Sequence, residues 1–87
     1  MEPLKKVIRI VLSGYQYKID SSNYEDIIKI TFINHPAIIE IEKYKSIIKV
    51  SITMGDGERR IFPTMDESEF KERFKKIVRN NINNSTI

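Results

Sequence analysis

The sequence predicts an α+β fold: a single two-layer domain, an antiparallel β-meander of four to five strands with an N-terminal helix and a C-terminal helix on one face. Its 87 residues leave room for one hydrophobic core. Apolar side chains recur every second residue through the middle of the chain and at helical spacing near both ends. Each expected strand has one apolar and one polar face. Helices packed on the apolar side alone would therefore bury the apolar residues of the whole sheet. We expect the domain to span residues 1–82 and residues 83–87 to form a flexible tail, since these show no periodicity.

The first segment, residues 3–13, allows two interpretations. As a helix it gathers its apolar side chains into one stripe, with Pro3 at a first helical position and Gly14 as a C-terminal cap. As a strand, residues 7–11 are rich in β-branched side chains and would lead into a tight turn at Gly14. The helix is favoured because the stripe and both end signals agree.

The middle of the chain predicts strands by its period-two alternation. The third and fourth expected strands are the clearest; in the third, Ile39 and Ile41 point inward while Glu40 and Glu42 point outward. Polar or proline-containing turns separate the strands, because proline cannot donate to a β-ladder. The expected strands span residues 15–19, 27–33, 37–43, 47–54 and 59–62.

The final helix has a strong start signal. With Asp66 as N-cap, Glu69 falls at the capping-box position, and Met65 and Phe70 fall at the two positions of a hydrophobic staple. Thr64 is the alternative N-cap, but it gives a poorer staple. The helix is expected over about 67–80 and its buried stripe comprises Phe70, Phe74, Ile77 and Val78.

The composition excludes several classes of function. The chain has no cysteine, so neither a disulfide framework nor a thiolate metal site can form. No apolar run approaches the roughly 20 residues of a membrane span, and the N-terminus lacks the apolar core of a signal peptide. We therefore expect a cytoplasmic protein with no membrane partner. The net charge of +3 is only a weak indication of nucleic-acid binding.

No group of residues indicates catalysis. His35 is the only histidine; it precedes Pro36 in an expected turn, without a second base or ligand at suitable spacing. Residues 55–57 read Gly-Asp-Gly, but the lysine and hydroxyl residue of a phosphate-binding loop are missing and Glu58 follows instead. A hairpin turn explains this segment better. The sequence predicts a protein that is not an enzyme and has no cofactor or metal.

Two carboxylates, Glu40 and Glu42, share the polar face of one expected strand. In principle they could act as an acid–base pair. Lys29 and Lys49 face the same way on the strands expected to flank them, so cross-strand ion pairing is the simpler interpretation.

The final helix carries carboxylates at its start and cations toward its end. This polarity complements the helix dipole, and oppositely charged residues four positions apart support the helix. Stabilisation of the helix explains the pattern without a ligand. The cations are Lys71, Lys75, Lys76 and Arg79.

The segment from Tyr15 to Asn80 has strands followed by a capped helix with basic residues. In this element order it resembles in outline the single-strand-binding transcriptional coactivators, which carry a curved antiparallel sheet and a C-terminal helix. The resemblance involves no diagnostic residue and leaves the N-terminal helix outside it. It implies a surface for single-stranded nucleic acid.

Two hypotheses for the function follow. The first is a non-enzymatic small binding or regulatory protein acting by protein–protein interaction, for example an inhibitor from a phage, virus or mobile element. The alternative is a single-stranded nucleic-acid-binding domain that uses basic and aromatic residues of the sheet. The first is favoured, because Glu40 and Glu42 lie in the middle of the surface that a nucleic acid would cover. A homodimer is compatible with either hypothesis. Catalysis at a homodimer interface is a third and less favoured hypothesis.

Both hypotheses use the polar face of the sheet, where isoleucines interrupt the charges. The candidate binding face comprises Lys18, Lys29, Glu40, Glu42, Lys49, Arg59, Arg60 and Phe62, with Ile27, Ile33, Ile38 and Ile47 between them.

Overall fold

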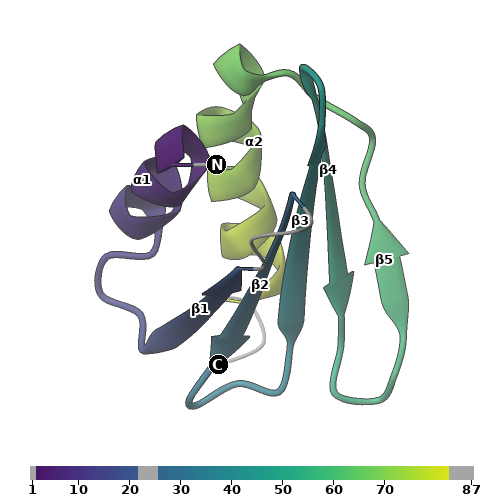
Figure 1. Cartoon of the computed structure of the whole chain (residues 1–87). Helices are drawn as coiled ribbons and strands as arrows, with labels where there is room; N and C mark the ends of the chain where they lie inside the picture. Colours follow the sequence, from purple (N-terminus) through teal and green to yellow (C-terminus); the bar gives the residue numbers. More distant parts are fainter. Residues whose placement is uncertain (1, 22–25, 83–87) are drawn as a thin grey trace.

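The computed structural model of the chain describes residues 2–21 and 26–82, and within them it shows two helices and five strands (Figure 1). The tail expected at residues 83–87 lies outside the described residues. The elements are α1 (Glu2–Val11), β1 (Tyr17–Ser21), β2 (Ile27–Phe32), β3 (Ile38–Tyr44), β4 (Ile47–Thr53), β5 (Arg59–Ile61) and α2 (Glu67–Asn81).

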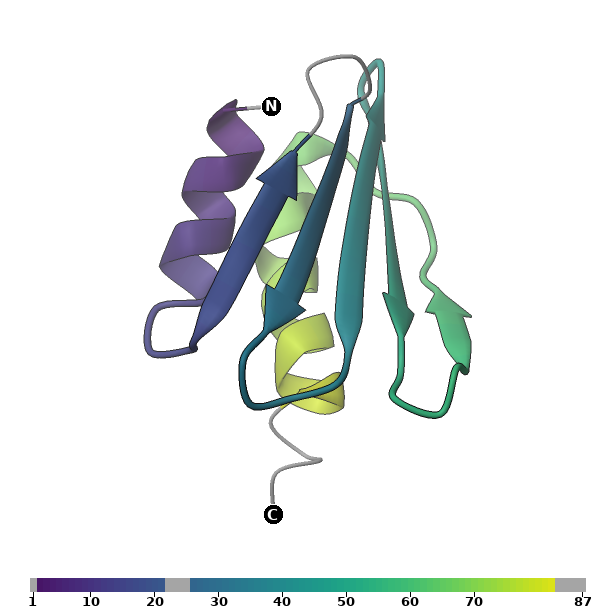
Figure 2. The same ribbon diagram turned by 60° about the horizontal axis from the view of Figure 1, so that its bottom comes forward.

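The strands form one antiparallel sheet in the order β1-β2-β3-β4-β5, so each strand pairs with its neighbour in the sequence. Both helices lie on the same side of this sheet (Figures 1 and 2). Helix α1 packs beside α2, and α2 packs over β4. The predicted α+β fold, with a five-stranded meander and two terminal helices, is confirmed.

The first segment is a helix, as the favoured interpretation predicted. Leu4, Ile8 and Leu12 are buried along one side of it. The helix ends in a turn in which the Tyr15 backbone N–H donates to the Leu12 carbonyl at 2.9 Å, and Gly14 has a φ of 94°. Tyr15 is therefore part of the helix exit and not of the first strand, which begins two residues later than expected.

The core lies between the helices and the apolar face of the sheet. The register places Ile28 opposite Ile41, and Ile41 opposite Val50; a parallel row joins Ile30, Ile39 and Ile52. All six side chains are fully buried. Because strand side chains alternate between faces, this register turns Lys29, Glu40, Glu42 and Lys49 to the opposite side.

The chain covers the edge of β4 beyond the end of β5. Pro63 interrupts the pairing, as expected, and the chain then returns to β4 at Met65. There the Ile48 N–H donates to the Met65 carbonyl at 2.7 Å, and the Met65 N–H donates back at 3.0 Å. The free edge on this side of the sheet is consequently that of β5 alone.

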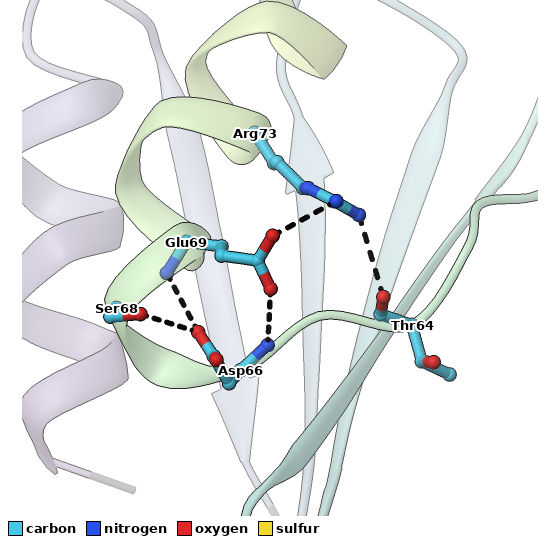
Figure 3. A network of polar contacts seen from close by, with 5 residues as sticks. All are labelled: Thr64, Asp66, Ser68, Glu69 and Arg73. Atoms are coloured by element: carbon cyan, nitrogen blue, oxygen red, sulfur yellow. Dashed lines mark hydrogen bonds and ion pairs between the residues drawn. The ribbon is translucent and has the colours of Figure 1, made fainter.

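A network of polar contacts fixes the start of α2 (Figure 3). The predicted N-cap is confirmed: Asp66 accepts a hydrogen bond from the Glu69 N–H at 3.0 Å, and the Glu69 carboxylate accepts one from the Asp66 N–H at 3.3 Å. Arg73 pairs with Glu69 at 2.9 Å and also donates to the Thr64 carbonyl. Lys43, at the end of β3, pairs with Glu67. These contacts hold α2 against the sheet.

Candidate functional site

The face of the sheet that points away from both helices carries no other element among the described residues (Figure 2). We call it the outer face. It bears four cations, three carboxylates, four isoleucines, Tyr44 and the hydroxyl side chains of β2 and β4. Its charged members are Lys18, Asp20, Lys29, Glu40, Glu42, Lys49 and Arg59, and its isoleucines are Ile27, Ile38, Ile47 and Ile61.

Charges of opposite sign alternate across the outer face. The register places Lys29 between two carboxylates, with Asp20 opposite on β1 and Glu40 opposite on β3. Glu42 in turn lies opposite Lys49 on β4. The predicted cross-strand neighbours are therefore correct. Because the signs nearly cancel, the outer face has only a small positive charge.

These cross-strand neighbours do not form direct ion pairs. Among the described residues, the ion pairs that the structure shows join other side chains, at the helices and next to β5. Glu40, Glu42 and Lys49 are half-buried between their neighbours, while Lys29 is exposed. The two carboxylates are consequently not neutralised by a direct ion pair among the described residues.

Two exposed apolar side chains lie together at one end of the outer face. Tyr44 and Ile47 flank the turn between β3 and β4, with exposed fractions of 73% and 51%. Ile27 on β2 is a diagonal neighbour of Tyr44, because it lies opposite Glu42. Ile61 on β5 is 58% exposed. Ile33 is also exposed but follows the end of β2.

Arg60 and Phe62, which the sequence placed in the candidate binding face, lie on the helix side of the sheet. Arg60 is opposite Ile52, which faces the core, and its guanidinium donates to the Asn81 side chain of α2 at 3.0 Å. Phe62 packs against the core. The register of β5 therefore leaves Arg59 on the outer face and turns Arg60 to the other side.

Ser51 is a buried polar residue on the outer face, with an exposed fraction of 3%. Its neighbours across the sheet are Glu40 on β3 and Ile61 on β5. The Arg59 guanidinium donates to its hydroxyl at 3.4 Å. The alternation of β4 indicates only that Ser51 faces outward. Its burial by neighbouring side chains cannot be recognised from that alternation.

The strongest concentration of positive charge lies on α2, not on the sheet. From residue 71 onward this helix carries five cations and one carboxylate, all of them exposed. Between α2 and the segment after β5 lies an open hollow of about 240 Å³. Its floor is apolar, formed by Phe62, Pro63, Met65 and Ile77, and its rim includes Arg73 and Lys76.

His35 and the turn at residues 55–57 form hydrogen bonds that explain them structurally. The His35 Nδ1 accepts a hydrogen bond from the Ala37 N–H at 3.1 Å, which stabilises the turn before β3. Between β4 and β5, Asp56 accepts a hydrogen bond from the Glu58 N–H, and the Gly57 N–H donates to Met54, as in a hairpin turn. Among residues 2–21 and 26–82 no group of His, Asp and Glu side chains is arranged to hold a metal ion.

The fold defines a small α+β protein in which no element among residues 2–21 and 26–82 covers the outer face of the sheet. No protein family, curated protein or solved structure matches the chain in our comparisons. Neither of the two described helices has the length and apolar character needed to cross a membrane.

Proposed function

We propose that the protein is a non-enzymatic binding module that docks onto a protein partner through the outer face. The observation that carries this proposal is the register of the charged residues, which sets each central lysine opposite a carboxylate. A protein surface with its own alternating charges can complement such a pattern, which gives specificity and orientation. The exposed side chains of Tyr44, Ile47 and Ile61 supply apolar contact area beside it.

A single-stranded nucleic acid fits the outer face less well. Its backbone carries a regular series of negative charges, and proteins neutralise them with tracks of cations. On the outer face, Glu40 and Glu42 lie on β3 between Lys29 of β2 and Lys49 of β4, and they interrupt a track through these two lysines. Of the aromatic side chains that could stack with bases, Phe62, Tyr15 and Tyr17 pack against the core, which leaves Tyr44 as the exposed ring among the described residues of the outer face. These positions favour the protein-binding hypothesis over its alternative.

The test compares two variants that change the net charge equally. Glu40→Lys with Glu42→Lys alters the outer face, and Glu2→Lys with Glu72→Lys alters exposed positions of the helices. Each variant and the wild type would be immobilised, and the proteins captured from an extract of the source cells would be quantified. We expect one protein to be captured by the wild type and by the helix variant, and to be lost with the outer-face variant, because its complementary charges are no longer matched.

The proposal fails if all three forms capture the same proteins in the same amounts. It also fails if light scattering shows the wild type to be a dimer that the outer-face variant dissociates, since a second copy of the chain then occupies the face.

A further inference from the structure

The edge of β5 and the hollow beside it form a second surface, which shares Arg59 and Ile61 with the outer face. No strand pairs with this edge among the described residues (Figure 1). The Met54 N–H donates to the Glu58 carbonyl, and the Phe62 N–H donates to the Val50 carbonyl, so residues 58, 60 and 62 direct their backbone groups toward β4. Because these groups alternate along an antiparallel strand, Arg59 and Ile61 direct theirs to the free edge.

Two arginines bridge the chain on either side of the hollow. Arg60 reaches from β5 to Asn81 near the end of α2, and Arg73 reaches from α2 to the carbonyl of Thr64. Between them lies the apolar floor that includes Phe62 and Ile77. The hollow is of a size to receive one large apolar side chain.

The charges around this surface are mainly positive. Glu58 and Glu69 pair with Arg60 and Arg73, respectively. Arg59 and Lys76 have no ion pair among the described residues. An anionic ligand would therefore meet two cations without an ion pair, Arg59 on the outer side of β5 and Lys76 on the rim of the hollow.

We propose that the β5 edge takes an extended acidic peptide as an added strand, with an apolar side chain of that peptide in the hollow. The outward backbone groups of Arg59 and Ile61 would form main-chain hydrogen bonds with the peptide. The hollow would bind one side chain of the peptide and so give specificity, as in other cases of strand addition. A second copy of the chain is disfavoured as the occupant. If two β5 strands paired antiparallel with their centres at Arg60, Arg60 of one copy would lie opposite Arg60 of the other. Like charges on paired strands are destabilising.

The probe is a synthetic peptide with a central leucine flanked on both sides by glutamates. Its control has lysines in place of the glutamates. In an amide NMR titration of the full chain we expect the acidic peptide to shift the signals of Arg59, Ile61 and Ile77, and to slow the hydrogen exchange of the Ile61 amide. The lysine peptide should leave these signals unchanged.

Matched variants locate the contact. Lys76→Glu reverses the charge on the rim of the hollow, while Lys71→Glu makes the same change at an exposed position of α2 outside its lining. We expect Lys76→Glu to weaken binding of the acidic peptide about tenfold and Lys71→Glu to leave it within about twofold. Ile61→Pro removes an outward N–H, and because that group does not pair with β4 the sheet should persist while binding is lost.

Several results would overturn the inference. They are equal binding of the lysine peptide, equal loss with Lys71→Glu and Lys76→Glu, or no shifts with the acidic peptide at millimolar concentration. Shifts of the same amides with single-stranded DNA would identify a nucleic acid as the occupant instead. Concentration-dependent shifts without any peptide would identify a second copy. Failure of the charge test leaves the outer face untouched, because Lys71→Glu and Lys76→Glu alter α2 alone.

Discussion

Phe70 and Phe74 attach α2 to the rest of the core. Both rings are fully buried, and they stack on each other with centroids 5.2 Å apart. Phe70→Ala or Phe74→Ala removes most of a buried ring from this tightly packed region, so each should lower the free energy of unfolding by about 3 to 5 kcal/mol. Urea denaturation measures this loss. Losses below about 1 kcal/mol for both variants would show that the two rings do not anchor the helix.

Asp66 makes the stability dependent on pH. The Ser68 hydroxyl and the Glu69 N–H donate to its carboxylate, and these hydrogen bonds lower the pKa of Asp66 below its ordinary value. Because folding lowers this pKa, the contribution is complete above the unfolded value of about 3.9 and is lost as the pH falls through the folded value.

Asp66→Asn is the matched variant, since asparagine keeps an acceptor for the cap and cannot titrate. We expect the wild type to be more stable than Asp66→Asn at neutral pH, and this difference to shrink below about pH 4. Urea denaturation of both proteins across the pH range measures it. A difference that stays constant down to low pH would mean that the Asp66 carboxyl does not titrate differently in the folded protein.

At the scale of elements, the exit from α1 depends on the backbone of Gly14. Its φ of 94° lies in a region that side chains with a Cβ rarely adopt, while the space around it is open. Gly14→Ala should therefore destabilise the protein through backbone strain alone, by about 1 to 2 kcal/mol. Thermal and urea denaturation would show this, and stability equal to the wild type would contradict the assigned conformation of the turn.

Most elements could be predicted from the sequence because their burial is periodic. The stripe of α1, the alternation of β3 and β4 and the capping box of α2 each reflect one physical constraint that acts locally. The side assigned to Arg60 and Phe62 could not be predicted in the same way. β5 has only three residues, and which of two successive arginines faces outward depends on its pairing with β4, where Arg60 lies opposite Ile52.

At the scale of the whole molecule, the charges are divided between two layers. The outer face of the sheet is nearly balanced, with four cations against three carboxylates, whereas the second half of α2 is strongly basic. The sequence identified most of the outer face, because six of the eight proposed residues belong to it. It did not identify the hollow beside α2, whose floor is formed by residues that are distant in sequence.

Replacing the two carboxylates of the outer face should create the cationic track that the wild type lacks. In Glu40→Lys with Glu42→Lys, lysines would stand beside Lys29 and Lys49. Affinity for single-stranded DNA should rise, since each added phosphate contact strengthens the electrostatic attraction and the dependence on salt. The helix variant, Glu2→Lys with Glu72→Lys, controls for the change in net charge. An equal rise in both variants would show that the outer face has no special role.

The most direct test of the proposed function is the binding of the wild-type protein to labelled single-stranded DNA over a range of salt concentrations. Because the outer face alternates in charge, we expect weak binding at about 0.15 M salt, with a slope of log affinity against log salt that indicates few phosphate contacts. Tight binding under these conditions, with a slope that indicates several contacts and is reduced by changing Lys29 and Lys49, would contradict the protein-docking function and assign the outer face to nucleic acid.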